Sequence, residues 1–182
     1  MKRSLTAGEI ALAQVMFQQA IDYAAVSLVF DSWWQKRSKT ALAPNGNVYF
    51  PRHARCEDFS LAAPHLQVWF MHEMTHVWQY QRGFSVLKSG VVLTCVGGYR
   101  HARAYQYLQA ACNQIKPFHL LNMEQQAEVV AHYFAGQCLR WQHYYCHLNH
   151  YEACLKDFLE QPKDKSLLPT YWQKRKADEI EC

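Results

Sequence analysis

The chain has 182 residues, half of them hydrophobic, and a formal net charge of +4. This length and composition suffice for one compact core, so we expect a single domain over 1–182, with a core at about 5–147 and a C-terminal helical extension at 148–182. The basic residues near 36–39 and 174–176 form short, separate clusters. Such clusters are usually solvated faces, and we expect no nucleic-acid partner.

The N-terminus does not resemble a signal peptide, because Glu9 interrupts the stretch where a continuous apolar segment should run. No apolar run reaches the length of a membrane span. The seven cysteines form an odd set without C-x-x-C spacing, which is typical of reduced thiols. We therefore expect a protein that is cytoplasmic in the producing cell. A protein exported without a signal peptide would have the same features.

Local signals in the first third of the chain predict one helix and a small sheet. Thr6 and Glu9 have the spacing of a capping box that starts a helix to about residue 20. The run 26–30 is apolar and predicts a strand. Asn45-Gly46 separates the apolar runs 40–43 and 48–50, and this pattern predicts a β-hairpin.

Residues His72-Glu73-Met74-Thr75-His76 spell H-E-x-x-H, the signature of zinc proteases. On a helix, positions i and i+4 lie on one face, so His72 and His76 can bind one metal ion with Glu73 beside them. Pro64 suits the first turn of such a helix, and Gly83 suits the left-handed position after its end. The alternative is a pair of core histidines that are merely hydrogen-bonded.

A catalytic zinc commonly takes two histidines and a carboxylate, and Glu124 is our candidate for the third ligand. Asn122 and Gln125 have capping-box spacing at the start of a helix predicted to run from 123 to about 147. Glu128 shares a face with Glu124 and could accept the free N–H of a ligand histidine. The alternative is that first-turn glutamates only complement the helix dipole.

The rest of the chain is less informative. The run 86–95 is ambiguous between strand and helix, and a further helix is predicted over 151–160, before Pro162. A rival metal site consists of His143, His147 and His150, which would share a face if the helix from 123 continued that far. No acid lies between them to act as a base, and ordinary surface or core histidines are the alternative.

The run 70–79 resembles the HE-[LM]-TH-V-x-Q core of bacterial Vgr-related metallopeptidases, which are associated with contractile injection systems and type VI secretion spikes. The blocks 43–50, 57–60 and 122–128 resemble further blocks of that family in the same order, so the resemblance spans roughly residues 5 to 135. In zincins with a glutamate ligand, E-x-x-x-[DE] commonly supplies the ligand first and its supporting acid second. The resemblance thus implies these roles for Glu124 and Glu128.

The ligand set predicts peptide-bond hydrolysis. Zn²⁺ would lower the pKa of its bound water toward ~7, and Glu73 would accept the proton as general base. The developing oxyanion needs a second stabiliser, and the segment between the two metal helices offers Arg100, His101, Tyr105 and Tyr107. We favour Tyr107, because the Tyr-x-Tyr segment at 105–107 resembles a strand of the family; aromatic packing is the alternative.

Taken together, we expect an α+β, helix-dominant, zincin-like fold with a small N-terminal β-sheet. The predicted function is a zinc metallopeptidase that acts as a type VI secretion effector or accessory, delivered by a contractile system. Its expected partners are a protein or peptide substrate, or less readily a peptidoglycan peptide, and a secretion spike or immunity protein. The alternative is a non-catalytic adaptor with a structural or vestigial zinc site.

Overall fold

The computed structural model describes residues 1–32, 40–95, 99, 104–107 and 115–169. The fold is α+β and helix-dominant, with a small N-terminal sheet, as predicted. Its helices are α1 (Ala7–Phe17), α2 (Pro64–Gln81), α3 (Val86–Cys95), α4 (Met123–Gln137), α5 (Gln142–Tyr145) and α6 (Leu148–Glu160); its strands are β1 (Lys2–Ser4), β2 (Ser27–Phe30) and β3 (Val48–Phe50). Within the described part of the chain, no helix combines the length and hydropathy needed to cross a membrane.

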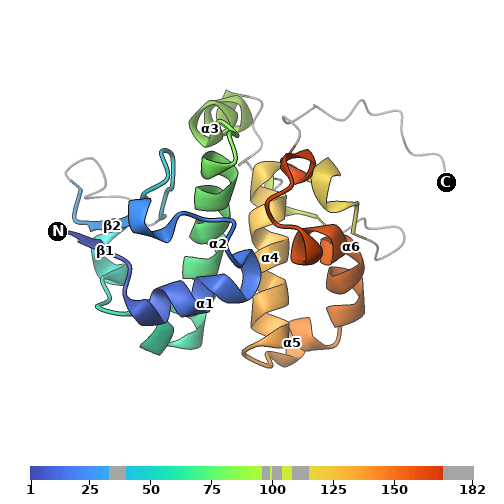
Figure 1. Ribbon diagram of the computed structural model, residues 1–182, viewed down its shortest axis with the longest axis horizontal. Helices are drawn as coiled ribbons and strands as arrows, with labels where there is room; N and C mark the ends of the chain where they lie inside the picture. The colour runs from blue at the N-terminus through green and yellow to red at the C-terminus, as the bar shows by residue number, and fades with distance from the viewer. Residues whose placement is uncertain (33–39, 96–98, 100–103, 108–114, 170–182) are drawn as a thin grey trace.

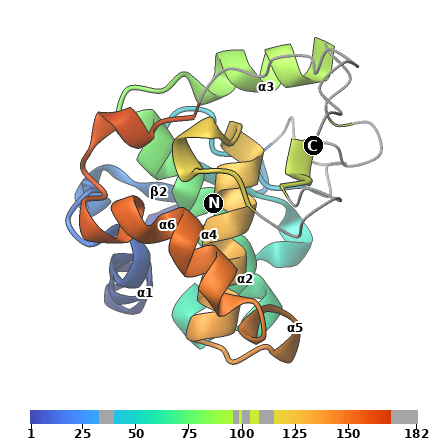
Figure 2. The ribbon, with the colours of Figure 1, turned by 90° about the vertical axis from the view of Figure 1, so that its right-hand side faces the viewer.

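Helices α2 and α4 lie side by side at the centre of the molecule (Figure 1). They are antiparallel, because His72 of α2 contacts Glu128 of α4 whereas Gln79 contacts Met123. The sheet and α1 lie on one side of this pair and α6 on the other, while α3 crosses one end (Figures 1 and 2). The core between these layers includes fully buried aromatic side chains: Phe17, Phe59, Phe70, Trp78, Phe134 and Phe158.

The sheet has the order β1-β2-β3, with β2 antiparallel to β1 and parallel to β3. The predicted strand at 26–30 is β2, whereas the sequence did not indicate β1, whose three residues carry no apolar alternation. The predicted hairpin is reduced to one antiparallel bridge between Leu42 and Tyr49, so 40–43 is not a ladder-forming strand. Gly46, in the turn, has a φ of 78°, which favours glycine.

The predicted starts of the helices agree with the structure more closely than their predicted ends do. Both capping boxes are present, with Thr6 at the start of α1 and Asn122 at the start of α4. Pro64 and Gly83 bound α2 as expected, and Gly83 has a φ of 102°. Helix α1 ends at Phe17, three residues before the expected end.

The single helix predicted from 123 to about 147 is wrong. Helix α4 ends at Gln137, and Arg140 has a φ of 55°, outside the helical region. The chain then forms the short α5 before α6 begins, which crosses α4 rather than extending it (Figure 2). The ambiguous run 86–95 is a helix, α3.

Residues beyond 147 pack into the same core as the central helices. Phe158 of α6 is fully buried and makes an edge contact with Trp78, with ring centroids 5.2 Å apart. The Trp78 indole N–H donates to the carbonyl of Pro162 at 2.7 Å. The described part of the predicted C-terminal extension is therefore structurally continuous with the core, and the outer bounds 1–182 stay a prediction.

A buried ion pair joins the sheet, α1 and the loop before α2. The Glu9 carboxylate is inaccessible to solvent and accepts two hydrogen bonds from the Arg3 guanidinium, at 2.7 and 2.8 Å. It also accepts the backbone N–H groups of Thr6 and Phe59, each at 2.9 Å. One charged group thus satisfies donors from three segments.

We expect Glu9→Gln to lower the free energy of unfolding by about 2–4 kcal/mol, because an amide has no charge and one acceptor oxygen, too few for the donors of Arg3, Thr6 and Phe59 that the carboxylate now binds. Urea unfolding measures this loss. Glu57→Gln is the matched control, since Glu57 is exposed and its substitution should change the free energy by less than about 0.5 kcal/mol. Equal values for the two variants would show that the ion pair contributes nothing.

Candidate metal centre

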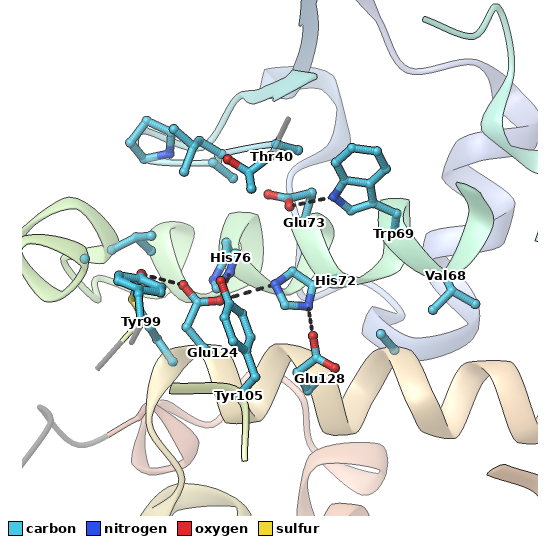
Figure 3. A pocket seen from close by; sticks show the side chains of 18 of the residues that line it. Thr40, Val68, Trp69, His72, Glu73, His76, Tyr99, Tyr105, Glu124 and Glu128 are labelled. Carbon is cyan, nitrogen blue, oxygen red and sulfur yellow. Dashed lines mark hydrogen bonds and ion pairs between the residues drawn. The ribbon is translucent and has the colours of Figure 1, made fainter. Parts of the chain in front are cut away.

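Two histidines of α2 and one glutamate of α4 converge on a single point. His72 Nε2 and His76 Nε2 each lie 3.3 Å from Glu124 Oε2, and the three ligand atoms all lie within 4.8 Å of one another. Figure 3 shows the three side chains facing each other between the helices. This cluster could hold a metal ion, and within the described residues no other group of three His, Cys, Asp or Glu side chains has such geometry.

The cluster lies in a cavity of about 1100 Å³ between α2, α3, α4 and the segment 40–44. His76 and Glu124 are buried, whereas His72 is partly accessible. The site is therefore shielded from bulk solvent on the helix side and open on the cavity side. Two imidazoles and a carboxylate, with free space beside them, match the donor set of a catalytic divalent metal site.

Gln79 orients His76 through a hydrogen bond with the imidazole. Its amide nitrogen donates to the Met123 carbonyl and to Gln126 Oε1, each at 3.1 Å. Its amide oxygen therefore faces His76 Nδ1, at 2.9 Å, and accepts that ring's N–H. In the neutral ring this leaves the Nε2 lone pair directed at the cluster.

A chain of four side chains orients His72. His72 Nδ1 lies 3.2 Å from Glu128 Oε1, and the other oxygen of Glu128 lies 3.0 Å from His132 Nε2. His132 Nδ1 contacts the Tyr107 hydroxyl at 2.7 Å, which in turn contacts the Tyr151 hydroxyl at 2.9 Å. In one consistent assignment, the Tyr151 hydroxyl donates to the Tyr107 hydroxyl, which donates to His132 Nδ1. The N–H groups of His132 and His72 then both donate to the Glu128 carboxylate. His132 was not predicted from the sequence, although it stands four residues after Glu128.

Of the two tyrosines expected near the site, Tyr105 and Tyr107, one lines the cavity, together with Tyr99, which was not predicted. Tyr107 is engaged with His132 and Tyr151 and does not line the cavity. Tyr99 and Tyr105 do line it; the Tyr99 hydroxyl donates to Glu124 Oε1 at 2.7 Å, and the Tyr105 ring lies 6.3 Å from that of His72. Residues 104–107 contain no strand, and Arg100 and His101 lie outside the described residues.

Glu73 lies beside the cluster with one oxygen unused. It is buried, and the indole N–H of Trp69, one turn earlier, donates to Oε1 at 3.3 Å. Among the residues that the structure describes, its Oε2 has no hydrogen-bond partner. A buried carboxylate oxygen without a donor is costly, so this atom is suited to accept a proton or hydrogen bond from a molecule in the cavity. The i, i+4 spacing of Trp69 and Glu73 is the signal that could have identified Trp69.

The rival cluster is not assembled. His143 lies in α5, whereas His147 precedes α6 and His150 lies within it. The rings of His147 and His150 stack with centroids 6.0 Å apart, but no third ligand completes a metal-binding group among the described residues. The expectation that all three share one helix face fails because the chain leaves the helical conformation after Gln137.

No family model matches the chain. The type VI secretion system spike protein VgrG2b of Pseudomonas aeruginosa is 38% identical over 138 residues, which cover 72% of this chain and 13% of the spike protein. The solved effector domain of Pseudomonas aeruginosa VgrG2b superimposes with a TM-score of 0.61 and 32% sequence identity, over 85% of this chain and 82% of that chain. The chain belongs to the family of the VgrG2b effector domain. The predicted resemblance to Vgr-related proteins is thus confirmed.

In this member of the VgrG2b effector-domain family, the cluster is a network of mutually stabilised charges. Burial opposes the charged form of His72, but hydrogen bonds with Glu124 and Glu128 outweigh it and raise the pKa of His72 to about 10. Burial likewise opposes ionisation of Glu124, but the two imidazoles hold its pKa well below the usual range. Burial raises the pKa of Glu73.

These shifts predict the pH dependence of the metal-free VgrG2b-like domain. The folded pKa of His72, about 10, exceeds its ordinary value of 6.5, so its contribution to stability is full below about pH 6.5 and lost as the pH rises toward 10. We expect the free energy of unfolding, measured in chelator, to fall more between about pH 6 and pH 10 in the wild type than in Glu124→Gln/Glu128→Gln. Parallel curves for the two proteins would contradict the proposed charge network.

Proposed function

We propose that this chain is a zinc-dependent metallopeptidase in which His72, His76 and Glu124 hold the metal. The observation that carries the proposal is Glu73: a buried carboxylate with an unused oxygen, beside a His-His-Glu cluster, in one cavity. A purely structural metal site needs no such base. In a non-catalytic adaptor, burying a carboxylate oxygen without a hydrogen-bond donor would cost free energy and serve no reaction.

Bound zinc would lower the pKa of a coordinated water to about 7 and polarise the substrate carbonyl. Glu73 Oε2 accepts the proton of the attacking water and passes it to the leaving amine. In the metal-free protein burial raises the pKa of Glu73, which makes its carboxylate a stronger base. Trp69 holds the other oxygen, so the carboxylate keeps its orientation during both steps.

Glu128 and Gln79 act on the ligands rather than on the substrate. Each accepts the N–H of one imidazole and thereby directs the opposite nitrogen toward the metal position. Glu128 carries a charge and Gln79 does not, so the two histidines differ in basicity. Glu124 contacts the Nε2 atoms that face the cluster, whereas Glu128 contacts the opposite nitrogen of His72. These positions support the assignment of Glu124 as ligand and Glu128 as supporting acid.

The oxyanion needs a donor that faces the cavity. The sequence favours Tyr107, but its hydroxyl is engaged with His132 and Tyr151. We therefore assign the oxyanion role to Tyr105, an alternative from the same segment that lines the cavity. Burial raises the pKa of Tyr105, so the phenol stays protonated and able to donate.

Pairing of an extended substrate with the backbone of 41–43 is proposed from its hydrogen-bond pattern, and it requires Ala41 and Ala43, which are only 7% and 3% exposed, to become accessible. Leu42 exchanges both of its backbone hydrogen bonds with Tyr49, so the N–H and C=O groups of Ala41 and Ala43 point away from β3. Among the hydrogen bonds of the described residues, none involves the backbone of Ala41 or Ala43. Since this segment lines the cavity, a peptide added as a strand would pass the metal site (Figure 3).

The biological setting that we propose follows the relatives. VgrG2b is a type VI secretion spike protein, and its matching part is an effector domain. We propose that this chain is likewise a type VI secretion effector or accessory that acts on a protein or peptide after delivery. Peptidoglycan crosslinks are the less favoured substrate, and a spike and an immunity protein are the proposed partners.

The purified protein should hold about one zinc ion per chain, as measured by elemental analysis. Glu124→Ala should abolish tight binding because a ligand is lost, whereas Glu128→Ala should weaken it by about 10–100-fold. His143→Ala/His147→Ala is the control and should retain full zinc. The opposite order of losses for the two glutamates would reverse their roles.

Glu73→Gln should preserve the fold and zinc content but reduce peptide hydrolysis by orders of magnitude, because the amide cannot accept the proton. Cleavage of an unfolded protein or peptide library by the zinc-loaded proteins measures this. Glu57→Gln, which removes an exposed carboxylate that does not line the cavity, is the control for altered charge. Wild-type turnover by zinc-loaded Glu73→Gln would refute the peptidase proposal.

A further inference from the structure

The two carboxylate oxygens of Glu124 have different partners. Oε2 faces the cluster and lies 3.3 Å from both His72 Nε2 and His76 Nε2. On the other side of the carboxylate, Oε1 accepts a hydrogen bond from the Tyr99 hydroxyl at 2.7 Å (Figure 3). An ionised carboxylate has no proton to give, so the phenol is the donor. One oxygen is thus directed at the metal position and the other is held by the protein.

The hydrogen bond between Tyr99 and Glu124 is short and shielded from water. Its length of 2.7 Å is typical of a hydroxyl that donates to a charged carboxylate, which is among the stronger hydrogen bonds in proteins. Glu124 is 6% exposed and Tyr99 is partly buried, so solvent competes little for either group. The last torsion of a glutamate side chain is otherwise broad, with weak preference for any angle. The phenol therefore fixes a carboxylate plane that would be free to turn.

Separate parts of the structure fix the two ends of this hydrogen bond. The backbone N–H of Glu124 donates to the side chain of Asn122, the N-cap of α4, at 2.9 Å. The Tyr99 ring packs against a small hydrophobic cluster apart from the main core, whose buried members are Phe84, Val86, Leu93, Ala104 and Met123. Val86 and Leu93 belong to α3. Helix α3 thus helps to hold the phenol against the proposed ligand.

We propose that Tyr99 is a positioning residue that keeps Glu124 a single-oxygen ligand, so that a metal held by His72, His76 and Glu124 retains an open position. The inference rests on the metal site of the proposed function. A carboxylate can bind a metal through one oxygen or through both. Binding through both would fill the position that a catalytic zinc leaves for water or substrate. The Tyr99 hydroxyl occupies Oε1 and opposes this second contact.

The test compares the Co²⁺-loaded wild type with Tyr99→Phe, which removes the hydroxyl and keeps the ring. Co²⁺ replaces zinc at such sites, and its visible absorption weakens when a ligand is added to a four-coordinate ion. Without the phenol, Glu124 is free to bind through both oxygens, so the variant should absorb less strongly at equal metal content. Azide, a small anion that binds at open metal positions, should bind the variant about tenfold more weakly, as expected if the position is open in roughly one molecule in ten.

Tyr105→Phe is the matched control, because it removes another hydroxyl from the same cavity but not the one that contacts Glu124. Its Co²⁺ absorption and azide affinity should equal those of the wild type, although its proposed oxyanion role predicts slower hydrolysis. Wild-type absorption and azide affinity in Tyr99→Phe would overturn the positioning role. Equal changes in the two variants would overturn it as well, because they would reflect the polarity of the cavity rather than one hydrogen bond.

A crystal structure of the zinc-loaded wild type tests the inference without any variant. It should show one Glu124 oxygen on the metal and the other on Tyr99; both oxygens on the metal would overturn the inference even if the protein cleaves peptides. If Tyr99→Phe shows the expected changes but the zinc-loaded wild type cleaves no peptide, the positioning role stands and the peptidase proposal fails. If the wild type binds neither zinc nor Co²⁺, both proposals fall.

Discussion

One carboxylate oxygen, Glu124 Oε2, fixes how the two central helices, α2 and α4, are rotated and aligned against each other. It lies 3.3 Å from an imidazole nitrogen of both His72 and His76, which are 52 and 48 residues away in sequence. Burying these groups without one another would be costly, so α2 and α4 must keep one rotation and one register. Sheet, α1 and α6 then pack around a pair whose geometry is already fixed.

The sequence predicted those features that are encoded within a few neighbouring residues. Capping boxes, Pro64 before α2 and Gly83 after it are local, and so are the ligand spacings on each helix. Strand β1 exists because it pairs with β2, whose residues stand 23 to 27 positions later in the sequence, and its own residues carry no strand pattern. The end of α4 was missed because Arg140, which has positive φ, is not a residue type that signals a break.

The same distinction holds within the site. His72, His76 and Glu124 could be proposed because a metal demands particular residues at particular spacings, whereas the choice among tyrosines could not be made. Tyr107 faces His132 and Tyr151, 25 and 44 residues away, and only the path of the chain decides this. Sequence spacing identifies chemistry that is repeated along one helix, but it does not show which side chains meet across helices.

The buried amide of Gln126 connects the candidate metal cluster to the segment around Leu167. It accepts from Gln79, which orients His76, and donates to the carbonyls of Phe118 and Leu167, each at 2.8 Å. Without solvent to replace these bonds, they must break together. Detachment of the segment around Leu167 would therefore loosen the side chain of Gln79, which orients His76, so local opening there and disorder in the candidate metal cluster belong to one cooperative unit.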